Sequence, residues 1–201
     1  MAVSRIKTSS VLQGFPKSRS LLIGNDPYKP GVYESIASAT GTGSSGTITF
    51  SSIPSTYASL QLRIISRDTN AATTVEGIKV RFNNDSATNY VRHTLKSDGT
   101  TASAVGNITQ NGIFIETTPQ SNTPANVVGA AIIDIHNYTS TTQNKTLRAL
   151  AGADLNRTNA GLIGLTSGLW LNTNAITRID ILATASFSTQ TQIALYGIRG
   201  A

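Results

Sequence analysis

Short runs in which apolar and polar residues alternate dominate this sequence, and each run ends at a cluster of Asn, Asp, Gly or Ser. The alternation is clearest at residues 60–64 (LQLRI) and 78–82 (IKVRF), where every second side chain is apolar. A period of two is that of a β-strand, whose successive side chains point to opposite faces of a sheet. Because turn-forming residues bound each run, the chain is constrained to fold as many short strands.

Ten such runs follow residue 46, with the spacing that is typical of a β-sandwich or a β-barrel. They are residues 47–52, 60–67, 77–83, 89–95, 112–116, 127–137, 146–151, 161–171, 176–183 and 192–198. The sequence shows no convincing helical period in any segment. We therefore predict an all-β fold, a jelly-roll-like antiparallel β-sandwich preceded by an extended N-terminal arm.

The first 33 residues differ from the rest of the chain. They hold five basic residues and one acidic residue, in a chain whose formal net charge is +6. Three of the six prolines are here, and the apolar residues come in small clumps without a sustained period. Proline favours extended backbone around it. We predict three parts: an extended basic arm at residues 1–33, a Gly/Ser/Thr-rich linker at residues 34–46, and the sandwich at residues 47–201.

A solvated, disordered tail is the alternative interpretation of the arm. Disordered tails are depleted in large apolar residues, and this segment is not. Nucleic acid is a second alternative partner for its positive charge. The basic residues, however, form no run of like charges and are not interleaved with aromatic residues. We therefore expect the arm to bind an acidic protein surface rather than nucleic acid.

The composition is poor in side chains that perform catalysis. There is no Cys, which excludes disulfides, thiolate nucleophiles and zinc ribbons. The two histidines, His93 and His136, are far apart in the sequence, which argues against a multi-histidine metal site. We expect no enzyme activity, no cofactor and no metal site. No apolar run approaches the roughly 18 residues of a membrane span, and residues 1–10 do not resemble a secretory signal.

Asp134 and His136 form the one acid–base pair that we single out. Their spacing places both side chains on the same face of a strand. A hydrogen-bonded structural pair is the favoured interpretation, and a catalytic role is the alternative. A glycan-degrading enzyme would need converging carboxylates, which the sequence does not show. Charged residues make up only 13% of the chain, against roughly 25% in an average soluble domain, so we expect a surface that contacts other proteins.

Several segments resemble a family of small virion structural proteins of tailed bacteriophages. The most specific are the arm at residues 4–22 (SRIKTSSVLQGFPKSRSLL), residues 48–57 (ITFSSIPSTY) and the ending at residues 195–201 (LYGIRGA). Shorter matches are residues 33–37 (YESIA), 60–63 (LQLR), 128–136 (VGAAIIDIH) and 167–170 (SGLW). The resemblance covers most of the chain, and these segments carry no catalytic chemistry. Members of the family include decoration and fibre proteins.

The resemblance implies a capsid decoration or cement protein on the outer head of the virion. It would form a homotrimer whose arms bind the major capsid protein and lock neighbouring capsid subunits together. The alternative is a receptor-binding module of a tail or head fibre that recognises a host polysaccharide or protein, with Tyr57, Tyr90, Tyr138 or Trp170 as candidate contacts. The expected capsid-contact residues of the arm are Arg5, Ile6, Lys7, Leu12, Phe15, Lys17, Arg19, Leu21 and Leu22.

Overall fold

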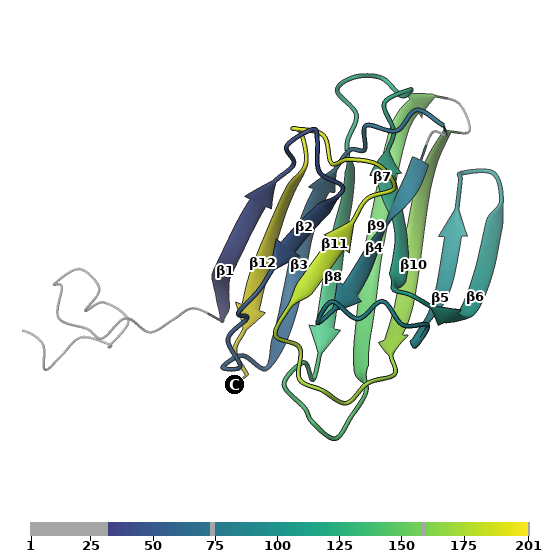
Figure 1. Ribbon diagram of the computed structural model, residues 1–201. Coiled ribbons are helices and arrows are strands. Elements are labelled where there is room, and N and C mark those ends of the chain that lie inside the picture. Colours follow the sequence, from purple (N-terminus) through teal and green to yellow (C-terminus); the bar gives the residue numbers. More distant parts are fainter. Residues whose placement is uncertain (1–31, 73–74, 158–159, 201) are drawn as a thin grey trace, which may run out of the picture. The chain divides into compact units, whose positions relative to one another are not determined.

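The computed structural model describes residues 32–72, 75–157 and 160–200. Along these residues the chain forms twelve β-strands and no helix (Figure 1). The strands are β1 (Tyr33–Thr40), β2 (Thr47–Phe50), β3 (Ser59–Ser66), β4 (Val75–Phe82), β5 (Tyr90–Ser97), β6 (Ala102–Gln110), β7 (Ile113–Pro119), β8 (Gly129–His136), β9 (Lys145–Arg157), β10 (Ala160–Trp170), β11 (Ile179–Leu182) and β12 (Gln192–Ile198).

The strands form two antiparallel sheets that face each other as the layers of a sandwich (Figure 1). The larger sheet has eight strands in the order β1-β12-β3-β8-β9-β10-β5-β6, and the smaller has four in the order β2-β11-β4-β7. Consecutive strands β2, β3, β4 and β5 alternate between the sheets, as in a jelly roll. Between β3 and β5 a simple jelly roll has one strand, whereas this sheet has the three-stranded meander β8-β9-β10. Strands β1 and β12 extend the larger sheet beyond β3. The predicted all-β antiparallel sandwich is confirmed, and the predicted extended arm lies outside the described residues except for its last two positions.

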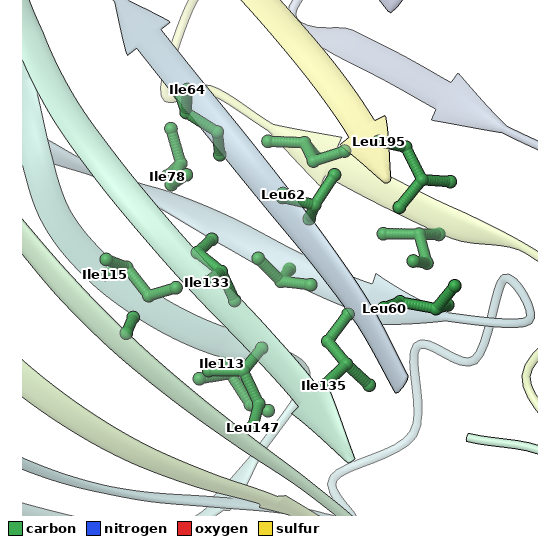
Figure 2. Close-up of a cluster of buried hydrophobic side chains, with 14 of the residues drawn as sticks. Leu60, Leu62, Ile64, Ile78, Ile113, Ile115, Ile133, Ile135, Leu147 and Leu195 are labelled. Carbon is green, nitrogen blue, oxygen red and sulfur yellow. The ribbon is translucent and has the colours of Figure 1, made fainter. Parts of the chain in front are cut away.

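Aliphatic side chains from both sheets fill the space between them. Leu62 of β3, Ile133 of β8 and Leu147 of β9 point inward from the larger sheet, and Ile78 and Ile115 point inward from the smaller one (Figure 2). Each of these side chains is fully buried. Their burial stabilises the fold by about 1.5–3 kcal/mol per side chain relative to exposure. This core explains why every second residue is apolar in residues 60–64 and 78–82.

An aromatic group closes one end of the core. The Trp170 and Tyr90 rings are stacked with their centroids 6.2 Å apart, and Phe82 packs against both. The indole Nε1 of Trp170 donates a hydrogen bond of 2.8 Å to Asp85, which also accepts hydrogen bonds from the Asn89 side chain and from a backbone N–H in its own turn. Asp85 thereby ties the β4–β5 turn to the end of β10.

All ten predicted strands are present, and two further strands were missed. The predicted linker at residues 34–46 is wrong over its first part, because these residues belong to β1, which pairs with β12. The sandwich therefore begins at Tyr33 rather than at residue 47. The second missed strand is β6, which pairs with β5. Both are edge strands that carry many small or polar residues, so their sequences lack the buried alternation that marks an inner strand.

We expect Asp85 to make the protein's stability depend on acid pH. Burial raises the pKa of Asp85, but hydrogen bonds from Asn89, Trp170 and Ala87 favour its carboxylate more strongly, so the pKa lies below the ordinary value of 3.8. The unfolded chain then binds the proton more tightly than the folded one, and stability falls as the pH drops through this range. The stabilisation is complete well above pH 3.8.

The variant Asp85→Asn tests this expectation. At neutral pH its free energy of unfolding should be lower by about 2 kcal/mol, because hydrogen bonds to a charged group are lost. Below about pH 5 the free energy of the wild type should fall more steeply than that of the variant. Urea unfolding at a series of pH values measures both. Parallel pH curves for the two proteins would contradict the role of Asp85.

Candidate functional site: the outer face of the eight-stranded sheet

The face of the larger sheet that is turned away from the smaller sheet is distinguished by several exposed large aliphatic side chains. We call it the outer face. The register of the strands arranges its side chains in rows that cross the sheet. In one row Ile132, Leu150, Leu165 and Leu95 lie directly opposite one another on β8, β9, β10 and β5. We call these four residues the aliphatic row.

Large aliphatic side chains are unusually exposed on this face. The four members of the aliphatic row, together with Ile65 and Ile163 in the next row, have exposed fractions between 43% and 60%. Contiguous apolar patches of this kind on a soluble protein mark contact surfaces for other molecules. The outer face is therefore the first candidate for an interaction site.

A shallow hollow of about 1370 Å³ lies beside the aliphatic row. Its floor contains Ala130 and Gly152, which face each other on β8 and β9 and have almost no side chain. In the same row, Ile65 flanks Ala130 and Ile163 flanks Gly152. The hollow thus exists because two large side chains stand on either side of two very small ones.

A polar network borders the aliphatic row on the side of β3 and β12. The Arg63 guanidinium lies 5.7 Å from the ring centroid of Tyr33 and 5.4 Å from that of Tyr196. Arg63 Nε donates to the Gln61 side chain, whose Nε2 donates to Asp134 Oδ1 at 2.9 Å. Tyr and Arg side chains held in place by such contacts are typical of the residues that dominate protein–protein binding energies.

A second feature, the clasp, fixes the chain where β1 begins. It consists of Glu34, Tyr57, Gly197 and Arg199. Arg199 forms an ion pair of 2.7 Å with Glu34 and lies 5.3 Å from the centroid of the Tyr57 ring. Gly197 lies against the same ring, and a Cβ at this position would be 2.4 Å from its atoms. The backbone N–H of Arg199 also donates to the carbonyl of Val32.

The clasp unites three segments that are far apart in the sequence. Glu34 comes from residues 33–37, Tyr57 from residues 48–57, and Gly197 and Arg199 from residues 195–201. These are three of the segments on which the phage-protein resemblance depends. The clasp therefore joins the start of β1 to the end of β12 and to the segment before β3.

The expected capsid-contact residues, Arg5 to Leu22, lie outside the described residues. Asp134 and His136 do lie on one face of β8, with outward positions on the outer face. Asp134 accepts the hydrogen bond from Gln61 and stands opposite Arg148, whereas His136 stands opposite Ser59 and Thr146. Asp134 is thus part of the polar network, and its hydrogen bond is made with Gln61 rather than with His136.

Three of the four aromatic residues considered as receptor contacts are in the core. Tyr90, Tyr138 and Trp170 have exposed fractions of 0%, 0% and 1%, and Tyr57 is half-buried in the clasp. The Tyr138 hydroxyl donates to the carbonyl of Pro54 and accepts from the N–H of Tyr57. Tyr90, Tyr138 and Trp170 therefore stabilise the sandwich and are not available as a platform for a sugar.

The exposed aliphatic residues of the outer face were not predicted, although the sequence contains a pattern that indicates them. Residues 130–133 (AAII), 147–151 (LRALA) and 162–165 (LIGL) interrupt the alternation with consecutive apolar residues. A strand that is apolar on both sides is typical of burial on both faces. In this sheet one of the two faces is instead exposed.

Within the described parts of the chain, no three His, Cys, Asp or Glu side chains gather as metal ligands. The same residues contain no helix of the length and apolarity that a membrane crossing requires. No protein-family model, no curated protein and no solved structure matches this chain.

We expect the close contact between Gly197 and the Tyr57 ring to make the protein's stability sensitive to substitution of this glycine. The substitution Gly197→Ala should lower the free energy of unfolding by about 1–3 kcal/mol, because the added methyl group forces the Tyr57 ring away. In a Tyr57→Ala background the same substitution should cost much less, so the two changes are coupled. Urea unfolding of the single and double variants measures the coupling.

Gly200→Ala is the matched control, because its Cβ would lie at an ordinary 3.4 Å from Ala58. It should change the free energy of unfolding by less than about 0.5 kcal/mol. Additive effects of Gly197→Ala and Tyr57→Ala would show that the ring does not set the conformation of this strand end.

Proposed function

We propose that the protein is a structural component of a phage virion, a decoration or cement protein on the outer surface of the capsid. The observation that carries the proposal is the character of the described surface. It presents an exposed aliphatic row and an ordered Arg63–Gln61–Asp134 network, which suit protein contacts. The aromatic residues Tyr90, Tyr138 and Trp170 are buried in the core, and Arg63 and Asp134 are linked through Gln61. These arrangements are typical of groups that stabilise a fold or a protein contact rather than of a catalytic site.

In this proposal the arm at the N-terminus binds the major capsid protein. Its basic residues meet acidic capsid side chains, and its apolar clumps fill surface pockets. The clasp supports this role, because Glu34, Tyr57 and Arg199 fix the start of β1 and so give the arm a defined point of departure. The three segments that meet in the clasp are among those whose sequences resemble phage virion proteins.

The proposed assembly is a homotrimer. Three arms that leave one trimer act together, because the binding of one arm raises the effective concentration of the other two near their sites. A single weak arm is then sufficient for stable attachment to the capsid. No nucleic acid, membrane or cofactor takes part in this function.

The second candidate function is receptor binding by a tail or head fibre. The observation in its favour is the pair of rings, Tyr33 and Tyr196, that flank Arg63 on the outer face. An aromatic pair with a cation can contact a host polysaccharide or protein. The burial of Tyr90, Tyr138 and Trp170 weakens this candidate, since it removes the other aromatic contacts.

The number of copies in each purified virion distinguishes the two functions. For a decoration protein, quantitative mass spectrometry should find hundreds of copies, in a fixed ratio to the major capsid protein. A handful of copies would favour the fibre. Absence from the particle would overturn both candidates.

Deletion of residues 1–31 tests the role of the arm while leaving β1 and the clasp intact. The shortened protein should keep the circular dichroism spectrum of the sandwich and its cooperative unfolding. It should not bind to capsids that lack the protein, whereas the full chain should. Binding of the shortened protein at full occupancy would contradict the arm mechanism.

A further inference from the structure

We infer that the outer face is a contact surface between two copies of this chain, related by a two-fold axis. The axis lies midway between the two facing sheets, runs parallel to the strands, and is positioned above the boundary between β9 and β10. Face-to-face packing of two β-sheets with nearly aligned strands is a common arrangement. Four properties of the face support a second copy as its partner.

The first property is size. The proposed axis pairs β9 with β10, β8 with β5 and β3 with β6, so six of the eight strands face the second copy. Neighbouring strands lie about 4.8 Å apart, so these six strands span about 29 Å. The strands β3 and β8 each carry four outward residues, and successive outward residues are about 6.8 Å apart along a strand. The facing area is therefore about 800 Å², which matches the roughly 800 Å² that each partner buries in a standard stable interface.

The second property is charge. Along the described strands the outward charged residues are Arg63, Asp134, Arg148 and Asp154, which sum to zero. The whole chain has a net charge of +6. A strongly acidic partner would find no excess of positive charge on this face. Two copies, in contrast, can meet there without repulsion between like charges.

The third property is the symmetry of the aliphatic row. The proposed axis exchanges β9 with β10 and β8 with β5. It therefore places Leu150 on Leu165 of the second copy and Ile132 on Leu95 of the second copy. A self-complementary patch of this kind is what a two-fold interface requires. The contact would bury all four exposed aliphatic side chains of each copy.

The fourth property is shape. The same axis places Ile163 of one copy over Gly152 of the other, because these residues are direct cross-strand neighbours on the two strands beside the axis. Ile163 is 60% exposed, and Gly152 lies in the floor of the hollow. Each copy then inserts one large side chain into the hollow of the other.

A two-fold contact and the three-fold contact of the proposed function can coexist in one assembly of six chains if they use different surfaces of each copy. The two-fold contact does not depend on the virion. The purified protein alone can show it, so its failure and the failure of the proposed function are distinguishable.

The first experiment measures the mass of the full chain in solution by sedimentation and light scattering over a wide range of concentrations. The wild type should contain an even number of chains. Leu150→Glu should halve that number and raise the dissociation constant at least about a hundredfold, because the symmetry buries the new charge twice. Leu165→Glu should act in the same way.

Leu171→Glu is the matched control. Leu171 is 48% exposed, similar to Leu165, but lies beyond the end of β10 and six residues from the aliphatic row, about 20 Å along the strand. This variant should keep the even number of chains. The urea midpoint of each variant reports whether it is folded. An odd number of chains in the wild type, or equal effects of Leu150→Glu and Leu171→Glu, would overturn the inference.

A second experiment tests the geometry and uses the absence of Cys from the chain. The variants Ile132→Cys and Leu95→Cys are mixed and treated with a short bis-maleimide, since strands of packed sheets lie about 10 Å apart. The proposed axis places these two positions opposite each other, whereas like positions on the two copies are displaced sideways by three strand spacings, about 14 Å. The two different variants should become linked to each other faster than either becomes linked to itself. Equal rates in all combinations, or no linkage above that of Leu171→Cys, would overturn the proposed axis.

Discussion

The structure depends on the burial of alternate side chains between its two sheets. Leu62, Ile133 and Leu147 are completely buried, and a slip of one residue in any of these strands would move them into water. The core therefore fixes the register of the eight-stranded sheet. The register of the strands also sets which outward residues are cross-strand neighbours. Leu150 and Leu165 therefore lie side by side on the outer face.

The charged groups inside the protein hold loops in place. The Arg67 guanidinium is buried and donates to the carbonyls of Pro124 and Val127 at 2.9 and 2.7 Å, and burial lowers the pKa of Arg67. Lys145 is fully buried, with its Nζ donating to the carbonyls of Gln143 and Thr173, and its pKa is also lowered by burial. The buried Arg67 and Lys145 side chains thus stabilise the loops whose carbonyls they bind.

The clasp and the outer face complement each other in the proposed function. The clasp fixes the start of β1 through the Arg199–Glu34 ion pair and the contact of Gly197 with Tyr57. The outer face offers a neutral aliphatic surface to a second copy. In the proposed function the N-terminal segment would bind the particle, and the outer face would bind a neighbouring copy of the protein.

The all-β class, the ten alternating strands and inward residues such as Ile78 and Phe82 follow from the amino-acid sequence, because a period of two is a local property of a strand. The tertiary structure was needed to show that residues 33–40 and 102–110 are strands, because edge strands of small residues owe their conformation to the neighbour they pair with. It also decided the aliphatic row and the clasp. Both bring together residues from distant segments, and their alignment depends on a strand register that the packed core imposes.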